Sequence, residues 1–397
     1  MNYEQFIKGL FKFPGWVIER TNINSHAAII RLRLDERYCF KCPYCSGKTG
    51  LNRILKQTVK DLPLGEIKLV NIEYEARQSY CNNCNKYSTF LPDGIDNRAK
   101  ATKRLMIYVS RLCRFMPCNR IPLFVPISVA TAQRWDKKIL VEQLADPNFD
   151  NVRVIIVDEK SIGKNHNYLT VVINGESGEV LHLAEGKKAA SLNSFFDKLT
   201  VKQIENIEVA GIDRGGAYKS SIKKRAPKTK IVYDKFHLIF NFNKVIDIVR
   251  RTEQNKLEKG EKDFIKGQRY NLFRRPENRT EEQQSELNIL FEKNKPLFET
   301  DLLKDALQYL WTYRYTKSAD KYLDRWIGWA NETAIKPVIK FAKGLNRDRK
   351  EILNYIKYRV TSAKIEAFNN VIDRIVRRAC GYQDIEYLFL KIRQERS

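Results

Sequence analysis

The sequence lacks any apolar run long enough to cross a membrane. A spanning helix needs ~20 mainly apolar residues, and no stretch approaches that length, so we expect no membrane partner. The first residues, MNYEQFIKGLFKFPGW, also lack the basic and then apolar layout of a signal peptide. Both absences predict a cytoplasmic protein.

Acidic residues are too few to balance the basic ones. The chain has 72 Lys and Arg against 47 Asp and Glu, which gives a formal net charge of +25. Its 43% apolar and 11% aromatic content is ordinary for a globular protein and excludes disorder as the reason. The charge either only keeps the protein in solution or serves a polyanionic partner. The second explanation is favoured, with nucleic acid preferred over a membrane surface.

Five of the eight cysteines fall in two short clusters, which in a reducing compartment indicates metal rather than disulfides. Cys42-Pro-Tyr-Cys45 and Cys81-Asn-Asn-Cys84 each place two thiolates in a tight turn, and two such turns complete a tetrahedral zinc site. Cys39 forms the same spacing with Cys42 and remains an alternative ligand. Between the pairs, residues 70–77 alternate apolar and polar side chains, which predicts a half-buried strand. The pattern is that of a zinc ribbon.

Residues 96–148 are predicted to be helical. Apolar residues at 105, 109, 112 and 116 share one helix face. Ser128 is suited to cap the next helix. Ser128, Thr131 and Arg134 then have the spacing of a DNA-recognition helix in a helix-turn-helix. Three short helices that act only as a spacer are the alternative.

Strands and helices alternate from 149 to 254. We expect strands in VRVIIVD, YLTVVIN, VLHLAEG, IEVAGID and KIVYDKF, and helices at 191–199, 217–225 and 238–254. Because three strands precede the alternation, a mixed α/β sheet is predicted. Residues 255–360 read as charged, aromatic helices, and an amphipathic helix follows within 361–397.

Three acids have the setting of a metal site. Asp158 and Asp213 each end a predicted strand, and Glu366 lies in the first turns of the last helix. Acids at the ends of neighbouring strands, joined by one from a covering helix, are suited to hold two hard cations about 4 Å apart. Such a pair of ions supports phosphodiester transfer, and carboxylate oxygens suit magnesium or manganese.

Taken together, these segments resemble the DDE transposases of the ISL3 insertion-sequence family. The resemblance rests on VDEKSIGKNHNYLTVVIN, the Asp213 strand, YDKFHLIFNFNKVIDIVRR and KIEAFNNVIDRIVRRACGYQDIEYLFLKIR, and it extends to the cysteine pairs and the Ser128 helix. It implies a multidomain α/β protein with an RNase H-like core. The implied domains are a zinc ribbon (1–95), a helix-turn-helix (96–148), the core in two parts (149–254 and 361–397) and an all-helical insertion (255–360).

The same resemblance implies that Asp158, Asp213 and Glu366 bind the catalytic Mg²⁺ (or Mn²⁺). Asp234-Lys-Phe-His237 resembles the [C/D]xxH signature of transposases with helical insertions, so Asp234 and His237 are expected near the active site.

Some assignments stay open on the residues alone. Side chains of successive strand residues point to opposite faces, and both Asp158 and Glu159 fit the alternation, so only the resemblance selects Asp158. Glu351 and Asp373 compete with Glu366.

Glu366 is preferred because it starts a helical stripe at i, i+4 spacing that carries two candidate phosphate-binding arginines. The stripe consists of Glu366, Asn370, Arg374 and Arg378. Trp311, Trp326 and Trp329 of the insertion are expected in its core, with stacking on an unpaired base as the alternative.

The expected function is that of a DNA transposase. It would bind the terminal inverted repeats of an insertion sequence, cut at the element ends and join them to target DNA. No Ser or Tyr nucleophile motif calls for a covalent intermediate. Holding two ends requires a homodimer or larger complex, and the expected location is the nucleoid of a bacterial cytoplasm.

Two rival functions share part of this pattern. A non-catalytic, sequence-specific DNA-binding protein, such as a domesticated transposase or a regulator, would keep the ribbon and the charge, but the presence of all three acids counts against it. A structure-specific nuclease is disfavoured by the helical insertion and the N-terminal modules.

Overall fold

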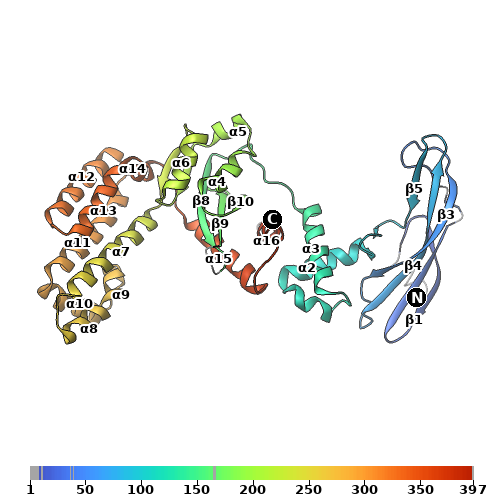
Figure 1. Cartoon of the computed structure of the whole chain (residues 1–397), viewed down its shortest axis with the longest axis horizontal. Helices are drawn as coiled ribbons and strands as arrows, with labels where there is room; N and C mark the ends of the chain where they lie inside the picture. Colours follow the sequence, from blue (N-terminus) through green and yellow to red (C-terminus); the bar gives the residue numbers. More distant parts are fainter. Residues whose placement is uncertain (1–8, 10–11, 36, 39, 164–166, 396–397) are drawn as a thin grey trace. The chain divides into compact units, whose positions relative to one another are not determined.

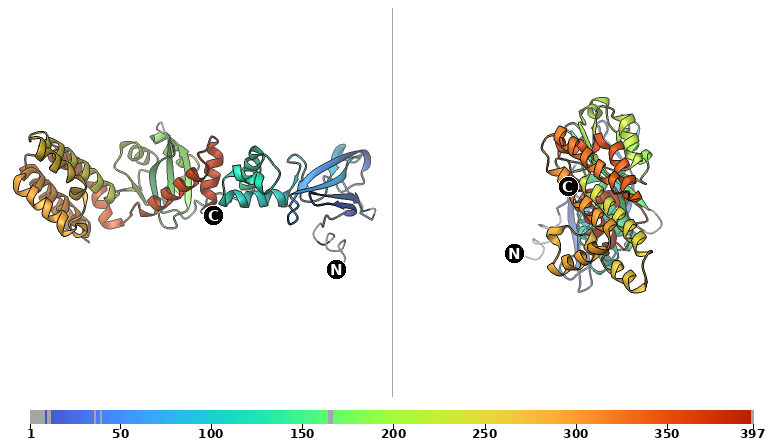
Figure 2. Two further views of the ribbon diagram at one scale, coloured as in Figure 1. Left: turned by 90° about the horizontal axis from the view of Figure 1, so that it is seen from below. Right: turned by 90° about the vertical axis from the view of Figure 1, so that its left-hand side faces the viewer.

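The computed structural model describes residues 9, 12–35, 37, 38, 40–163 and 167–395. The chain forms two compact units. The first comprises Met1–Ala145 and Arg374–Glu395, and the second comprises Asp146–Asp373. Figures 1 and 2 show the elements of both units from different directions.

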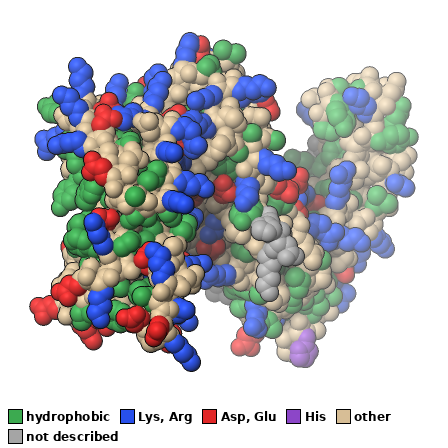
Figure 3. All heavy atoms as spheres, turned by 60° about the vertical axis from the view of Figure 1, so that its left-hand side comes forward, with side chains coloured by type: hydrophobic (Ala, Val, Ile, Leu, Met, Phe, Trp, Pro, Cys, Tyr) green, Lys and Arg blue, Asp and Glu red, His purple; other side chains and the backbone are tan. Residues whose placement is uncertain are grey.

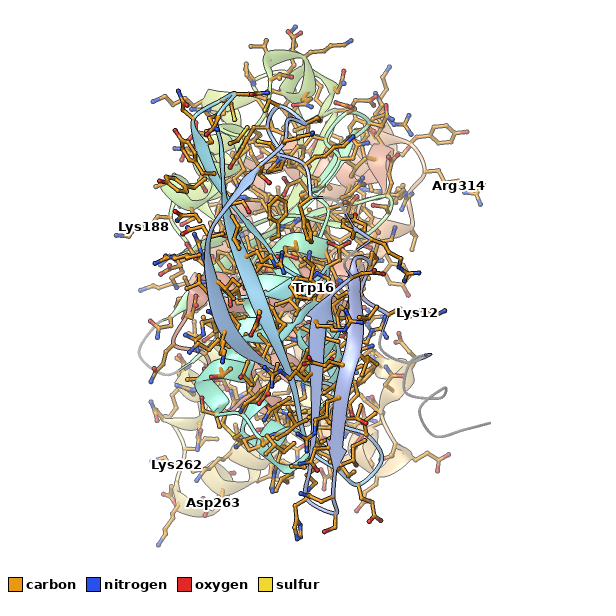
Figure 4. All side chains as sticks on the ribbon, turned by 90° about the vertical axis from the view of Figure 1, so that its right-hand side faces the viewer. Lys12, Trp16, Lys188, Lys262, Asp263 and Arg314 are labelled. Atoms are coloured by element: carbon orange, nitrogen blue, oxygen red, sulfur yellow. The ribbon has the colours of Figure 1, made fainter. Side chains whose placement is uncertain are left out.

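The first unit begins with a seven-stranded sheet in the order β1-β2-β4-β3-β7-β6, with β5 paired to β4. Its strands are β1 (Trp16–Ile23), β2 (Ala27–Leu34), β3 (Gly50–Asp61), β4 (Leu69–Cys81), β5 (Lys86–Phe90), β6 (Ile95–Asp96) and β7 (Ala101–Thr102). Buried and half-buried residues alternate along β4, which confirms the strand predicted there. Trp16, which is labelled in Figure 4, lies in the core of this sheet. It packs edge-on against Tyr74, with ring centroids 5.9 Å apart.

Helices follow the sheet. They are α2 (Lys103–Phe115), the 3₁₀ helix η1 (Cys118–Leu123) and α3 (Val129–Gln143). Ser128 caps α3, because its hydroxyl accepts a hydrogen bond from the backbone N–H of Thr131 at 3.1 Å. The predicted cap is therefore confirmed.

The C-terminal helix α16 (Ile385–Gln394) packs against α3 within the first unit. Asp136 of α3 is fully buried and accepts hydrogen bonds from Ser110 Oγ (2.6 Å), Tyr387 Oη (2.5 Å) and Lys391 Nζ (3.0 Å). A buried carboxylate needs such partners, so Asp136 holds α16 in place. The sequence-based division groups all of 361–397 with the α/β core, whereas Arg374–Glu395 lies with the N-terminal segments.

The second unit is built on a five-stranded mixed sheet in the order β10-β9-β8-β11-β12. Its strands are β8 (Val154–Ser161), β9 (Tyr168–Asn174), β10 (Val180–Glu185), β11 (Val209–Ile212) and β12 (Lys230–Tyr233). β8, β9 and β10 pair antiparallel, whereas β8, β11 and β12 run parallel. A strand is present in each of the five predicted runs, and the mixed α/β class is confirmed. β12 ends at Tyr233, earlier than the run KIVYDKF, because Asp234 caps α7, and β8 continues beyond VRVIIVD to Ser161.

Three helices accompany this sheet: α4 (Ala189–Phe196), α5 (Val201–Asn206) and α6 (Gly216–Arg225). Phe195 and Phe196 of α4 are buried in the core. α5 lies outside the predicted helices. A capping box between Thr200 and Gln203 begins it.

Helices joined by short loops make up the described chain from 255 to 360, which contains no strand. After α7 (Lys235–Gln254) come α8 (Lys259–Gly267), α9 (Arg269–Phe273), η2 (Pro276–Asn278), α10 (Glu281–Lys293), α11 (Lys295–Tyr309), η3 (Leu310–Thr312), α12 (Thr316–Glu332), α13 (Lys336–Arg347) and α14 (Arg349–Tyr358). Trp311 and Trp326 are buried, and Trp326 Nε1 donates to the carbonyl of Leu303 at 2.9 Å. These two rings serve the core, whereas Trp329 is 36% exposed.

The last long helix, α15 (Ala363–Arg378), starts in the second unit. Lys and Arg side chains are widespread on the face of the molecule seen in Figure 3, in line with the charge of +25. Within the described residues, no helix combines the length and apolarity needed to span a membrane.

Candidate active site

Three neighbouring parallel strands carry aspartates at the same level: Asp158 lies within β8, and Asp213 and Asp234 directly follow β11 and β12. Val157 of β8 pairs with Ile212 of β11, which pairs with Tyr233 of β12. The next residues in this row are Asp158, Asp213 and Asp234. Because side chains in one row of a sheet share a face, the three carboxyl groups gather at this edge.

Asp158 is held from two sides. Its Oδ2 accepts a hydrogen bond from Asn369 Nδ2 at 2.6 Å, and its Oδ1 accepts one from the backbone N–H of Glu159 at 2.7 Å. Burial, and then the charge of Asp213, raise the pKa of Asp158 to about 6. The two carboxylates are therefore close enough to repel each other.

Glu159 belongs to a different environment. Its carboxylate lies 3.7 Å from Lys187 Nζ, and it is exposed. The alternation along the strand leaves Asp158 and Glu159 equivalent, but pairing of β8 with β11 puts Asp158 in the row of Asp213.

His237 lies against the second aspartate. Its Nδ1 is 2.8 Å from Asp213 Oδ2. Asp234 caps α7 by accepting the backbone N–H of His237 at 3.3 Å, so the first turn of the helix carries the imidazole to the strand ends. The hydrogen bond with Asp213 raises the pKa of His237, which favours the charged ring.

Ser362, which precedes α15, and one face of this helix contact the sheet near the aspartates. Ser362 Oγ donates to Asp234 at 2.9 Å, Asn369 donates to Asp158, and Asp373 lies 2.7 Å from Lys160 Nζ. Spacings of seven and four residues place these contacts on one side of the helix.

Glu366 lies on this same side, four residues after Ser362 and three before Asn369. Its side chain is exposed. Among the described residues, only the cysteines discussed below bring three or more His, Cys, Asp or Glu ligand atoms within 4.8 Å of one another. The carboxylate of Glu366 thus does not close onto both aspartates in this conformation.

The competing acids are engaged elsewhere. Glu351 is mostly buried, and its Oε1 lies 2.9 Å from Lys219 Nζ, while Asp373 pairs with Lys160. Both already have cationic partners.

The stripe predicted along α15 is offset from the face that meets the sheet. Asn369, at i+3 from Glu366, makes the contact, and Asn370 does not. Arg378 lies 3.4 Å from Glu395, and Arg374 is exposed. Sequence reasoning therefore missed Asn369 and Ser362. The i+3 and i−4 spacing from Glu366 is the signal that identifies them.

Gly211 lets the segment before α15 approach the sheet. A Cβ on Gly211 would lie 2.8 Å from Cγ1 of Val360 and 3.6 Å from Cγ1 of Ile156. Val360 leads into the segment that carries Ser362 and Glu366, so the missing side chain helps to position the covering helix.

Gly211→Val is expected to destabilise the fold by about 1 to 3 kcal/mol, because the added methyl groups overpack this contact. Thermal denaturation followed by circular dichroism measures the change. Gly328→Ala in α12, where a Cβ meets nothing within 4 Å, is the matched control and should not lower the midpoint. Equal midpoints for Gly211→Val and the intact chain would contradict the packing argument.

The donor set at the strand ends suits a divalent cation. Asp158 and Asp213 bring two mutually repelling carboxylates to one edge, and the side-chain oxygen of Asn369 is buried without a hydrogen-bond partner. Oxygen ligands with excess negative charge are those that Mg²⁺ and Mn²⁺ prefer. The residues present therefore fit such an ion.

Without divalent cations, Asp158→Asn is expected to stabilise the protein at pH 7.5. The folded-state pKa of Asp158 is about 6 against 3.8 in a model compound, so between these values the folded chain binds more protons than the unfolded chain. The free energy of unfolding of the intact protein therefore falls as pH rises through this window, by at most about 3 kcal/mol. The variant lacks this carboxyl group and should not lose that stability.

Denaturation in EDTA at pH 5 and pH 7.5 tests this expectation, and the gain should be larger at pH 7.5. Adding Mg²⁺ should then stabilise the intact chain more than the variant. A variant that is less stable at pH 7.5, or an equal response to Mg²⁺, would count against a cation site here.

Four cysteines form a second cluster, in the first unit. Ligand atoms of Cys42, Cys45, Cys81 and Cys84 all lie within 4.8 Å of one another. The Cys42–Cys84 and Cys45–Cys81 sulfur distances are 3.5 and 3.4 Å. Four thiolates in this arrangement are compatible with tetrahedral zinc. The alternative ligand, Cys39, lies outside the described residues.

The predicted recognition helix begins beside a basic pocket. Ser128 Oγ lies 2.9 Å from Thr131 Oγ1, which accepts a hydrogen bond from Arg134 Nη2 at 3.3 Å. These side chains line a cavity of about 480 Å³. Its basic wall consists of Lys60, Arg98 and Lys100. Cations and backbone N–H groups at a helix start suit a phosphate.

Comparison with known proteins identifies the family of this chain. A transposase family model of the ISL3 type matches residues 155–392. The transposase for insertion sequence element IS1001 of Bordetella parapertussis is 28% identical over 356 residues, which covers 89% of this chain and 87% of the relative. The transposase for IS1557 of Mycobacterium tuberculosis is 27% identical over 263 residues, 60% of this chain and 59% of the relative. Because the family match spans more than half of the sequence, the chain belongs to the ISL3 family of DDE transposases.

Proposed function

We propose that this transposase binds the terminal inverted repeats of an insertion sequence and performs two-metal-dependent DNA cleavage and strand transfer. The observation that carries the proposal is the placement of Asp158 and Asp213 side by side on the parallel strands β8 and β11, one residue beyond the pair Val157 and Ile212. The helix that covers them has Glu366 on its sheet-facing side. The strand order β10-β9-β8-β11-β12, three antiparallel and then two parallel, supports an RNase H-like core with 255–360 as its helical insertion.

In this proposal Asp158, Asp213 and Glu366 hold two Mg²⁺ or Mn²⁺ ions. When bound, the ions activate a water or a 3′-hydroxyl and stabilise the leaving oxygen. Glu366, whose side chain is exposed, must close toward the aspartates for this purpose. The remaining residues orient these ligands.

Asn369 donates a hydrogen bond to one oxygen of Asp158 and so fixes the orientation of the carboxyl group. His237 does the same for Asp213, and a charged ring there would attract a DNA phosphate. Ser362 and Asp373 anchor α15 to the sheet on either side of Glu366. Such supporting hydrogen bonds typically affect activity by about 10- to 100-fold.

The reaction consists of two phosphoryl transfers. Water attacks the phosphodiester at the element end, and the bond to the 3′-oxygen breaks and frees a 3′-hydroxyl. That hydroxyl then attacks a target phosphodiester, forms the new bond and releases a target 3′-hydroxyl. Asp158, Asp213 and Glu366 act at the same site in both steps.

DNA recognition is assigned to the first unit. Ser128, Thr131 and Arg134 would meet the terminal repeat, the basic pocket would take a backbone phosphate, and zinc would stabilise the ribbon. Arg374 and Arg378 add cationic side chains on α15. Because two element ends must be joined, the proposal includes a homodimer or larger complex.

Incubation with duplexes that contain the element ends tests this function. With Mg²⁺ or Mn²⁺, denaturing gels should show cleavage at the ends and joined products, and EDTA or an unrelated duplex should give neither. A protein that binds the ends but never cuts or joins them under these conditions would instead be a non-catalytic DNA-binding protein.

A further inference from the structure

Two cysteines outside the cluster of four lie against each other at the end of α2. Cys113 belongs to the last turn of α2, and Cys118 is the first residue of η1. Both are free thiols, and their sulfurs are 3.5 Å apart. A disulfide needs ~2.05 Å, so a small movement of the two side chains would bring the sulfurs to bonding distance.

Cys118 also contacts the C-terminal helix. Its sulfur lies 3.4 Å from the hydroxyl of Tyr387, which itself donates to the buried Asp136. The thiol pair therefore borders the polar group that holds α16 on α3, and a change at Cys118 reaches this group directly.

The two thiols differ in accessibility and acidity. Cys113 is 3% exposed and Cys118 is partly exposed. Both line a cavity of about 1170 Å³ together with Tyr387 and Cys380. The hydrogen bond between the two thiols lowers the pKa of Cys118 to about 7, whereas the same contact and burial raise the pKa of Cys113. Cys118 is thus the sulfur with thiolate character near neutral pH, and the thiolate is the reactive form.

We propose that Cys113 and Cys118 are an oxidisable dithiol, which hydroperoxides convert to a disulfide with loss of the contact between Cys118 and Tyr387. The Cys118 thiolate attacks the peroxide, an S–O bond forms, the O–O bond breaks, and hydroxide leaves. The Cys113 sulfur then loses its proton and attacks Cys118, so that an S–S bond forms and the S–O bond breaks with release of water. Two thiols and one hydrogen peroxide give one disulfide and two waters.

Peptide mapping of the zinc-loaded full chain tests the site. Arg111, Arg114 and Arg120 allow trypsin to separate the two cysteines into peptides 112–114 and 115–120. After treatment with stoichiometric hydrogen peroxide and alkylation of free thiols, these peptides should be recovered as one linked species. Dithiothreitol should abolish it.

Variants separate this site from the other thiols. Cys380→Ser, which alters another thiol of the same cavity, should still yield the linked peptides, whereas Cys113→Ser and Cys118→Ala should not. Recovery of both peptides singly alkylated from the peroxide-treated intact chain, or a link from Cys118 to Cys380, would overturn the proposal.

Hydrogen–deuterium exchange tests the loss of the Tyr387 contact. The segment 385–394 should exchange faster in the oxidised than in the reduced intact chain and return to the reduced rate after dithiothreitol. Cys113→Ser should show no change with peroxide. Unchanged exchange in a chain shown to carry the disulfide would overturn the link to α16.

Discussion

Asp158→Asn and Asp213→Asn should each lower the rate of end cleavage by on the order of a thousandfold while leaving end binding intact. Each substitution removes one of the two adjacent carboxylates, Asp158 within β8 or Asp213 directly after β11, and with it the charge that would hold a cation. The proposed DNA-binding side chains belong to the other unit, so a gel-shift assay should give an unchanged affinity. Single-turnover cleavage measures the loss.

Nearby acids provide matched controls. Glu159→Gln and Asp373→Asn alter carboxylates that pair with lysines, and both should retain cleavage within about tenfold, the lower range for supporting contacts. Glu366→Gln should behave like the two aspartate variants. If Glu159→Gln abolished cleavage and Asp158→Asn did not, the assignment of the first acid would be wrong.

Loss of one cysteine of the cluster should have the second large effect. The intact chain is expected to carry one zinc, and Cys81→Ser should lose it, because Cys81 is fully buried at the end of β4. Structural zinc contributes about 10 to 16 kcal/mol in small zinc domains, so the end of the sheet near β4 and β5 should become sensitive to protease. Metal analysis and limited proteolysis measure both changes.

The control is Cys380→Ser, an exposed thiol outside the cluster, which should keep full zinc content. Cys39→Ser should also keep it, and Cys45→Ser should not. If Cys39→Ser lost zinc and Cys45→Ser kept it, Cys39 would be the ligand in place of Cys45.

The α/β region was largely predictable because its signals are local. Five apolar runs predict five strands, and two of them stop at an acid, which locates Asp158 and Asp213. Choosing between Asp158 and Glu159 requires the register between β8 and β11, a long-range pairing that alternation along one strand does not encode. The apolar runs therefore predict at which edge of the sheet the acids lie, but not which of Asp158 and Glu159 shares a face with Asp213.

The covering helix shows the same limit. An i, i+4 stripe from Glu366 selects Asn370, whereas the sheet contacts Ser362 and Asn369. Both stripes are allowed on one helix, and packing against the strand ends decides between them. The i+3 spacing from Glu366 makes Asn369 a candidate, but only the packing of the helix selects it over Asn370.

The first unit was predicted less completely. β4 is evident from the alternation of apolar and polar side chains. In β1 and β2 polar residues interrupt the apolar pattern, so neither their pairing with each other nor that of β2 with β4 is evident from the sequence. The position of α16 depends on the buried contact between Lys391 and Asp136, which are 255 residues apart. No local signal marks such a pair.

A crystal structure with end DNA and Mn²⁺ would show whether the three acids hold two cations. Two anomalous scattering peaks about 3.5 to 4 Å apart are expected, with carboxylate oxygens of Asp158, Asp213 and Glu366 at about 2.0 to 2.3 Å. Absence of Mn²⁺ from this edge of the sheet, or ions held by Glu159, Glu351 or Asp373 instead, would contradict this expectation.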